Sequence, residues 1–431
     1  MKMEAQLLKE MVHAFRGECK EIFEAIAQAP SGAVVASVEF EVRRRALACF
    51  GDVVGKALVC RDRSWERKES PTCRCGNRMR MVCRQAKTVL SVLGPLALRR
   101  RYYRCDRCGA SRVPFDEEMG LNGTFTSGAQ RLVSLCGSRS SFAEGARQLR
   151  ELSGLQVSRE TVRTKTLDVA RQLHHQQRSG RMLGEQAPLG LQQTDRVYVT
   201  LDGTSVNTVE DGWREMKLGA IYDQSKQRKH YVASLARCGD FGRMLRRHAG
   251  RVGVWDAGEK IAAGDGAGWI WRQIAVNFPS VDHEVLDYYH LAENIHKAAW
   301  TLYGDGSRRG RRWAGHKLKL VSRHGGQALI RWVDRTLKRQ RSRTTRQALN
   351  NLLAYLKKHA RRMQYPQLHA AGIDIGTGPL ESACKNVIGQ RLKGRGMRWK
   401  LCNVEVMARL RALLASTNAW DAFWDIRAQA A

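Results

Sequence analysis

The pattern of apolar and polar positions divides the chain into helical parts and a strand-rich middle. Over residues 1–62 apolar side chains recur every three or four positions, as in LLKEMVHAF, which predicts amphipathic helices. Residues 197–206, VYVTLDGTSV, are rich in β-branched and aromatic residues and predict a buried strand that leads into Asp202. MKLGAIY at 216–222 and KHYVASL at 229–235 follow, with turn-rich stretches between. These three segments predict an antiparallel meander.

Helices and strands alternate after the meander. The pattern predicts a helix at DFGRMLRRHAGRVG, a strand at 260–270 that contains Asp265, a helix at 271–278, a strand at 283–290 and a helix at LAENIHKAAWTLYG. The resulting order, β-β-β-α-β-α-β-α, is that of a ribonuclease H-like core, a mixed sheet with helices on both faces. We therefore expect a multidomain α/β protein with a core of this class.

The other segments differ from this core in composition. Residues 305–365 are polar, basic and helix-periodic, and they include Trp313 and Trp332. They predict an all-α insertion that either follows a DNA backbone or packs its tryptophans into a small core of its own. A linker is expected at 179–195. The predicted domains are a helical domain (1–62), a zinc-ribbon-like domain (63–120), a helix-turn-helix region (121–180), the first part of the core (190–300), the basic insertion (301–370) and the last part of the core with C-terminal helices (371–431).

Net charge restricts the classes of partner. Lys and Arg number 74 against 41 Asp and Glu, so the formal net charge is +33. Such a field favours a polyanion, and nucleic acid is the simplest choice, although a ribosome-associated or membrane-surface protein would share it. No stretch approaches the roughly 20 apolar residues that span a bilayer, and the N-terminus lacks a signal-peptide core. We expect a cytoplasmic, nucleoid-associated bacterial protein with no membrane partner.

Four of the twelve cysteines have the spacing of metal ligands. Cys73 and Cys75 form a Cys-x-Cys knuckle, Cys105 and Cys108 form a Cys-x-x-Cys knuckle, and glycine follows each. Two such knuckles with strand-like residues between them predict a zinc ribbon with one structural Zn²⁺. The first knuckle is one residue shorter than the usual form, so Cys83 as a ligand, or ordinary buried cysteines, are the alternatives.

SSFAEGARQLRELSGLQVSRETVRTK predicts a helix-turn-helix. A first helix from Phe142 to Leu152 is broken at Gly154, and Ser158 is placed to cap a second helix. An ordinary pair of packed helices would look similar. In a DNA-binding unit the start of the second helix meets bases and phosphates, and its candidate contacts are Arg159, Thr161, Arg163 and Lys165.

Three carboxylates stand where a metal site would need them. Asp202 and Asp265 each end a predicted strand and precede glycine, and Glu381 lies in the first turn of a helix that Pro379 opens. Buried carboxylates need a cation, and such a set suits two Mg²⁺ or Mn²⁺ ions for phosphoryl transfer. Asp374 and Glu293 are rivals for the third position. The candidate DNA contacts of this region are five cations and a residue that could stack on a base: Lys385, Arg391, Lys393, Arg395, Arg398 and Trp399.

Several of these blocks resemble those of a known family. VYVTLDGTSV, GDGAGWIW, EVLDYYHLAENI and GPLESACKNVIGQRLKGRGMRW are similar to the catalytic blocks of bacterial insertion-sequence DDE transposases, most closely the ISKra-type group, which is akin to Mutator-like transposases. The resemblance covers roughly residues 190–410. It implies a ribonuclease H-like core with an all-α insertion between the second Asp and the Glu, and it assigns catalysis to the three carboxylates above. The family's Asp-x-x-His signature falls on Asp287 and His290, where the histidine could contact DNA, orient a carboxylate, or only cap or pack a helix.

We therefore expect a DNA transposase. It would bind the terminal repeats of its element through the N-terminal modules, and it would cut and join strands by two-metal phosphoryl transfer. Its partners would be double-stranded DNA, both element ends and target, and at least one further copy of the chain at synapsis. The alternatives are a ribonuclease H-like nuclease or resolvase without strand transfer, and a non-catalytic zinc-containing DNA-binding regulator.

Overall fold

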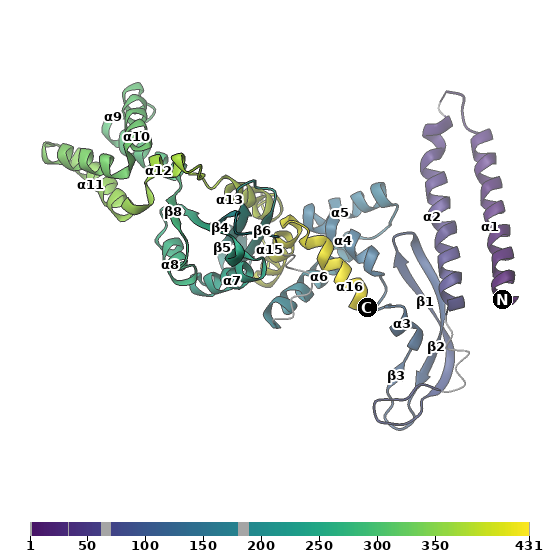
Figure 1. The fold of residues 1–431 in the computed structure, drawn as a ribbon. Coiled ribbons are helices and arrows are strands. Elements are labelled where there is room, and N and C mark those ends of the chain that lie inside the picture. The colour runs from purple at the N-terminus through teal and green to yellow at the C-terminus, as the bar shows by residue number, and fades with distance from the viewer. Residues whose placement is uncertain (1, 33, 62–69, 180–188, 431) are drawn as a thin grey trace. The chain divides into compact units, whose positions relative to one another are not determined.

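The described residues form two compact units. The computed structural model describes residues 2–32, 34–61, 70–179 and 189–430. One unit holds the chain up to Gln172 and from Phe423, and the other holds residues 173–422 (Figure 1). The predicted linker at 179–195 lies mostly outside the described residues.

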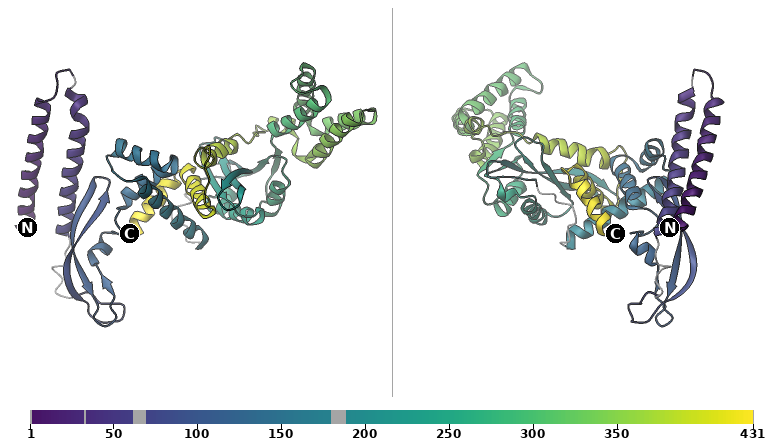
Figure 2. Two further views of the ribbon diagram at one scale, coloured as in Figure 1. Left: turned by 180° about the vertical axis from the view of Figure 1, so that it is seen from behind. Right: turned by 45° about the vertical axis from the view of Figure 1, so that its right-hand side comes forward.

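The first unit combines helices with a small antiparallel sheet. Helices α1 (Lys2–Ala27) and α2 (Val34–Arg61) run side by side as a hairpin (Figure 2). Strands β1 (Arg80–Ser91) and β2 (Gly94–Arg104) pair antiparallel through a two-residue turn, and β3 (Ser111–Arg112) pairs with β2. The helices that follow in this unit are α3 (Pro114–Glu118), α4 (Ser127–Arg139), α5 (Phe142–Gln148) and the first part of α6 (Arg159–Ser179).

The predicted pair of helices around Gly154 is present. Helix α5 continues into a π-helical turn at Leu149–Ser153, and the chain then reverses at Gly154, whose φ of 73° lies in the left-handed region that favours glycine. The Ser158 hydroxyl accepts a hydrogen bond from the Thr161 amide at 3.1 Å and so caps α6. Its use in DNA binding stays a prediction.

The second unit is built on a five-stranded mixed sheet. The strand order is β6-β5-β4-β7-β8, in which β4, β5 and β6 are antiparallel and β4, β7 and β8 are parallel. The strands are β4 (Arg196–Thr208), β5 (Gly212–Asp223), β6 (Lys229–Ser234), β7 (Glu259–Gly264) and β8 (His283–Leu286). Helices α7 (Cys238–Arg251), α8 (Gly268–Asn277) and α9 (Tyr288–Tyr303) lie between or after the strands, so the predicted order of elements is confirmed.

Two predicted strands are shorter than expected. The strand expected at 260–270 ends at Gly264, because the chain turns at Asp265 and enters α8 at Gly268. The strand expected at 283–290 ends at Leu286, because the next residue caps α9. Both corrections come from caps and turns, which a period-two pattern does not detect.

The remaining elements of the second unit are helical. They are α10 (Arg308–Lys338), α11 (Arg343–Lys358), α12 (Tyr365–Ala370), α13 (Gly378–Ala383), a π-helical turn (Cys384–Gly389), α14 (Gln390–Leu392), α15 (Leu401–Ala415) and the start of α16 (Ala419–Ala430). In the insertion Trp313 and Trp332 are half-buried with ring centroids 5.8 Å apart, and the Lys317 ammonium lies 3.3 Å from the Trp332 centroid. The tryptophans therefore pack in the insertion's own core. Within the described residues no helix combines the length and apolar character needed to cross a membrane.

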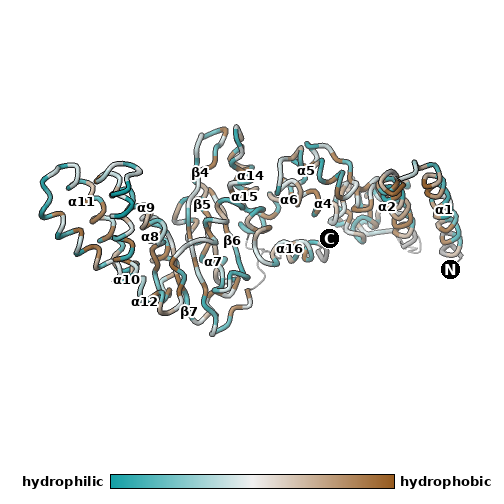
Figure 3. The backbone as a smooth tube through the Cα atoms, turned by 90° about the horizontal axis from the view of Figure 1, so that it is seen from above, coloured by the Kyte–Doolittle hydropathy of each residue, from teal (hydrophilic) through white to brown (hydrophobic). Residues whose placement is uncertain are grey.

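Alternate residues of β4 serve opposite faces of the sheet. Val197, Val199 and Leu201 pack in one hydrophobic cluster with residues of α7 and α8. Tyr198 and Asp202 point to the other face, where Tyr198 donates a hydrogen bond to Gln224 at 2.6 Å. Hydrophobic stretches along β4, β5 and β6 are visible in Figure 3. The polar groups of the candidate site therefore lie on the face of β4 that bears its even-numbered residues.

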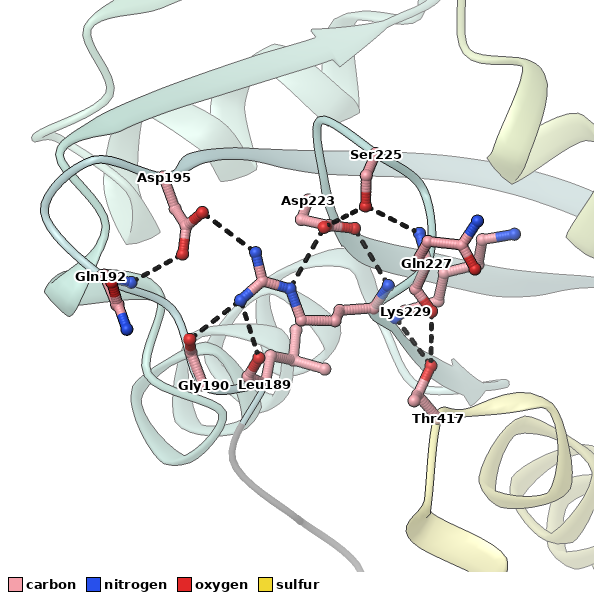
Figure 4. A network of polar contacts seen from close by, with 10 residues as sticks. Leu189, Gly190, Gln192, Asp195, Asp223, Ser225, Gln227, Lys229 and Thr417 are labelled. Carbon is pink, nitrogen blue, oxygen red and sulfur yellow. Dashed lines mark hydrogen bonds and ion pairs between the residues drawn. The ribbon is translucent and has the colours of Figure 1, made fainter.

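An arginine network anchors the entry to β4 (Figure 4). The Arg228 guanidinium donates to Asp195 at 3.0 Å, to Asp223 at 3.1 Å and to the Gly190 carbonyl at 2.8 Å. Next to it, the Thr417 hydroxyl accepts from the Lys229 amide at 3.0 Å. These contacts tie the β5–β6 turn to the segment before β4 and to the turn after α15.

A buried histidine pair lies between β6 and α7. His230 Nε2 and His248 Nδ1 are 2.9 Å apart, and both residues are buried. Burial lowers the pKa of His230 from 6.5 to about 4, and burial with neighbouring cationic groups lowers the pKa of His248 well below its usual value. The pair is therefore neutral in the folded protein at pH 7.

Acidification is expected to destabilise this unit through the histidine pair. Because the folded pKa is lower than the unfolded one, the unfolded state takes up protons first, and stability falls as pH drops from about 6.5 towards 4. At pH 5.5 the loss from His230 is about 1 kcal/mol relative to pH 7.5. Urea unfolding followed by tryptophan fluorescence measures it, and His230→Asn should reduce the difference between the two pH values. An equal difference in both proteins would contradict the assignment.

Candidate metal centre

Strand register brings two distant aspartates together. Strands β4 and β7 pair in parallel, with Thr200 opposite Ala263, a constant offset of 63 residues. The same offset carried two residues further places Asp202 opposite Asp265. Neighbouring strands lie about 4.8 Å apart, so the two aspartates lie side by side, Asp265 just past the end of β7 and Asp202 within β4, which continues to Thr208.

The next strand adds a third aspartate to the row. Strands β7 and β8 pair in parallel with Gly264 opposite Leu286, and one further step places Asp265 opposite Asp287. The Asp287 amide continues the ladder by donating to the Gly264 carbonyl at 2.8 Å. Three carboxylates therefore occupy successive positions along one edge of the sheet.

Asp202 lies in a partly buried, anionic setting. Its carboxylate accepts a hydrogen bond from the Gly203 amide at 2.6 Å and another from the Cys384 thiol at 3.3 Å. Burial raises the pKa of Asp202, and the charge of Asp265 raises it further, while His290 opposes the shift. A raised carboxyl pKa means that a cation placed here would stabilise the ionised form, so the site fits a divalent ion.

The loop that carries Asp265 is held by the insertion. Asp265 Oδ1 accepts from the Ala267 amide at 2.7 Å, and the Trp271 indole donates to the Asp265 carbonyl at 2.7 Å. A Cβ on Gly266 would lie 2.4 Å from the Tyr355 ring of α11. Glycine is therefore required where α11 packs on this loop.

Asp287 serves as a structural anchor. It is fully buried, and its Oδ1 accepts from the amides of Tyr289 at 2.8 Å and His290 at 3.0 Å, which caps α9. Its Oδ2 accepts from the amide and the hydroxyl of Thr377 at 2.6 and 2.7 Å. These four bonds use all the acceptor positions of the carboxylate, so Asp287 joins the start of α9 to the start of α13.

Helix α13 carries Glu381 close to this row of aspartates. Its amide donates to the Thr377 carbonyl at 3.0 Å, and Glu381 is half-buried. Ligand atoms of Asp287, His290 and Glu381 all lie within 4.8 Å of one another. Cys384 follows Glu381 by three residues, on the same helical face, and contacts Asp202. Sequence reasoning missed Cys384, which the spacing Glu-x-x-Cys could have indicated.

The two rival acidic residues lie in other settings. Asp374 forms an ion pair with Lys226 at 3.0 Å. Its backbone amide donates a hydrogen bond to the Tyr198 hydroxyl. Glu293 is 60% exposed and lies 3.6 Å from His290 Nδ1. Their positions favour Glu381 as the third ligand, and that choice stays a prediction.

The predicted DNA contacts after Glu381 fall into two groups. Lys385, Lys393, Arg395 and Arg398 are exposed, and the Lys393 ammonium lies 2.5 Å from the Thr204 hydroxyl, two residues beyond Asp202. The second group, Arg391 and Trp399, is not exposed.

Arg391 and Trp399 are buried, with 3% and 7% of their surface exposed. The Arg391 guanidinium lies 4.9 Å from the Trp399 ring centroid, and burial lowers the pKa of Arg391 to about 10. The two residues therefore pack against each other in the core of this unit, and their use in DNA binding stays a prediction.

Two of the predicted helix-turn-helix contacts interact with other residues of this unit, and one is exposed. Arg159 is exposed at the start of α6. Arg163 forms an ion pair with Glu160 at 2.5 Å, and the Lys165 ammonium lies 5.1 Å from the Phe125 ring centroid.

The four predicted zinc ligands meet in the first unit. Cys73 Sγ lies 3.4 Å from Cys108 Sγ, Cys75 Sγ lies 3.6 Å from Cys105 Sγ, and all four sulfurs lie within 4.8 Å of one another. A tetrahedral zinc with bonds of about 2.3 Å sets its sulfurs about 3.8 Å apart, so the cluster fits Zn²⁺. Cys83 is exposed on β1 and is not in this group.

Comparison with known proteins places the chain in a family. Residues 32–424 match the model described as "Uncharacterised protein family (UPF0236)". The chain belongs to UPF0236. A comparison of this UPF0236 protein with curated proteins finds no match. Among solved structures it is similar to one described as "Drosophila P element transposase strand transfer complex", at 9% identity and a TM-score of 0.33, over 69% of this chain and 94% of that chain. That TM-score is too low to establish a common fold.

The cysteine cluster leads to a metal-content prediction for this UPF0236 protein. The purified chain should contain one zinc per molecule by atomic absorption, and Cys105→Ser should lose it because three thiolates hold zinc poorly. Cys83→Ser is the matched control and should keep the metal. Zinc retained in Cys105→Ser would show that the cluster is not the ligand set.

The Asp287 anchor leads to a stability prediction. Asp287→Ala removes a helix cap and leaves the Thr377 amide and hydroxyl unpaired, so the free energy of unfolding should fall by about 3 kcal/mol. Denaturant unfolding measures the change. Asp334→Ala, which removes one surface ion pair on α10, should change it by less than about 0.5 kcal/mol. Equal effects from the two substitutions would contradict the anchoring role.

Proposed function

We propose that this UPF0236 protein is a DDE-type DNA transposase. The observation that supports the proposal is the strand register, which sets Asp202 beside Asp265, together with helix α13, at whose end Cys384 contacts Asp202 while Glu381 lies one turn earlier. A carboxylate site in a chain of net charge +33 suits chemistry on a polyanionic phosphodiester.

The sheet supports a ribonuclease H-like reading of the core. Three antiparallel strands are followed by two parallel ones, with β4 at the centre, and the expected carboxylates stand within β4 at Asp202 and just past the end of β7 at Asp265. The helical insertion lies between Asp265 and Glu381 in sequence, as the resemblance to insertion-sequence transposases implies. Membership of the ISKra-type group is the finer form of the proposal and rests on that resemblance alone.

The proposed roles follow from the positions of the side chains. Asp202, Asp265 and Glu381 would hold Mg²⁺ or Mn²⁺, whose part in the reaction is to activate a water or a 3′-hydroxyl and to stabilise the leaving oxygen. Asp287 keeps α9 and α13 in register, so that Glu381 faces the row. Lys393, beside Thr204 on β4, and the exposed Lys385, Arg395 and Arg398 would bind the phosphates.

The N-terminal elements would bind DNA and a second copy of the chain. The zinc-ribbon-like sheet and the helix pair α5–α6 are the candidate DNA-binding modules. The hairpin α1–α2 lacks the positive charge of the other modules, because residues 1–61 carry nine Lys and Arg against eight Asp and Glu. It also exposes large apolar side chains, among them Phe23 and Phe40 at 71% and 63%. A near-neutral apolar hairpin supports self-association, which synapsis of two DNA ends requires. We place this activity in the bacterial cytoplasm.

The proposal predicts metal-dependent strand cleavage and joining. DNA that carries the element's own ends is incubated with the protein and Mg²⁺ or Mn²⁺, and products are resolved on a denaturing gel. Asp202→Asn, Asp265→Asn and Glu381→Gln should each lower joining by about 1,000-fold, because each removes a charged ligand worth several kcal/mol, while DNA binding is retained.

Asp374→Asn is the matched control, since it removes a nearby carboxylate outside the proposed metal centre. It should retain joining within about tenfold. Cleavage without joining would contradict the transposase function and indicate a nuclease or resolvase. Strong DNA binding with an inactive wild-type protein on authentic ends would favour a non-catalytic regulator.

A further inference from the structure

We infer that His290 is a nitrogen ligand in the metal centre and forms with Glu381 a mixed nitrogen and oxygen subsite that takes Mn²⁺ in preference to Mg²⁺. The inference rests on the proposed function for the identity of the site. It adds a residue and a metal preference that three carboxylates alone do not imply.

The position of His290 is fixed by the backbone. Its amide donates to Asp287 Oδ1 at 3.0 Å, so the residue sits in the first turn of α9 at a defined distance from the end of β8. A ring nitrogen of His290 and a carboxylate oxygen of Glu381 lie within 4.8 Å of each other, so a small movement of the two side chains lets one ion bind both with bonds of about 2.1 Å. The ring is 35% exposed, which leaves the site open to a metal and to substrate.

The histidine has the neighbour that metal-bound histidines require. Glu293, one turn along α9, places its Oε2 3.6 Å from His290 Nδ1. This distance is just beyond that of a hydrogen bond, and a small rotation of either side chain would form one, which would orient a metal-bound imidazole and leave Nε2 for the ion. Glu293 is then a positioning residue and not the third carboxylate ligand.

The neighbouring aspartates divide into a saturated one and an available one. Asp287 belongs to the same group of ligand atoms, but its four hydrogen bonds leave it no free lone pair. Asp202 accepts only two hydrogen bonds among the described contacts. Of the grouped ligand atoms this leaves Glu381 and His290 available, with Asp202 and Asp265 on the adjoining strands.

The donor set decides the metal preference. Mg²⁺ takes oxygen ligands and retains water, whereas Mn²⁺ and later first-row divalent ions accept imidazole as well. An all-carboxylate site would accept Mg²⁺ and Mn²⁺ on similar terms. The nitrogen of His290 therefore raises the affinity of the subsite for Mn²⁺ relative to Mg²⁺.

Manganese itself is the probe that tests this ligand. Full-length, zinc-loaded protein without DNA is titrated with Mn²⁺, and the bound ion is examined by electron spin echo envelope modulation, which detects a coordinated ¹⁴N. The hard Mn²⁺ ion competes poorly for the thiolates of the Cys73 cluster, so zinc stays in place. The wild-type protein should show the ¹⁴N modulation, and His290→Ala should lose it. His296→Ala, two turns along the same helix, is the matched control and should keep it.

Competition with Mg²⁺ gives a second readout. The ratio of the Mg²⁺ to the Mn²⁺ dissociation constant should fall by at least about tenfold in His290→Ala, with the unfolding midpoint of each variant measured in parallel. His290→Gln, which retains a side chain of similar length, should behave like His290→Ala in both measurements.

The outcomes separate this inference from the proposed function. Bound Mn²⁺ without ¹⁴N modulation in the wild-type protein, together with weaker binding in Asp202→Asn, would leave the carboxylate site standing and overturn the role of His290. No Mn²⁺ binding that depends on Asp202 or Glu381 would overturn both. Modulation that survives in His290→Ala would assign the nitrogen to another residue and would also overturn the inference.

Discussion

The parallel pairing of β4, β7 and β8 is the constraint on which the candidate site depends. The offsets of 63 and 22 residues between paired positions are constant along these strands, so Asp202, Asp265 and Asp287 come to equivalent places at the same edge. A slip of one residue would turn each carboxylate to the opposite face, against the hydrophobic cluster that contains Val199 and Leu201. The same burial that stabilises the sheet therefore fixes the register of its acidic edge.

Asp287 extends this order beyond the sheet. Its two oxygens hold the first turn of α9 and the residue before α13, so one buried carboxylate sets the places of both His290 and Glu381. The insertion contributes in a similar way, because Tyr355 of α11 packs against Gly266 and restricts the loop that carries Asp265. Segments distant in sequence thus position the site without supplying its ligands, and their loss would act through geometry.

The sequence predicted the elements better than their limits or their contacts. Val, Tyr and Thr before Asp202, and the cysteine knuckles, are local signals, and both elements are present. Strands β7 and β8 are shorter than predicted because the chain turns at Asp265 and because Asp287 caps α9, and a period-two pattern detects neither event. Arg391 and Trp399 had the composition of a DNA-binding surface but stabilise the core, since a cation stacked on an aromatic ring can be buried. Cys384 was missed because its contact with Asp202 joins residues 182 positions apart.

The most direct test of the metal centre is the anomalous scattering of crystals soaked in Mn²⁺. The account predicts an anomalous peak bounded by the carboxylates of Asp202, Asp265 and Glu381, between the middle of β4, the end of β7 and the start of α13. Manganese found only elsewhere, with these three carboxylates in their present positions, would contradict it.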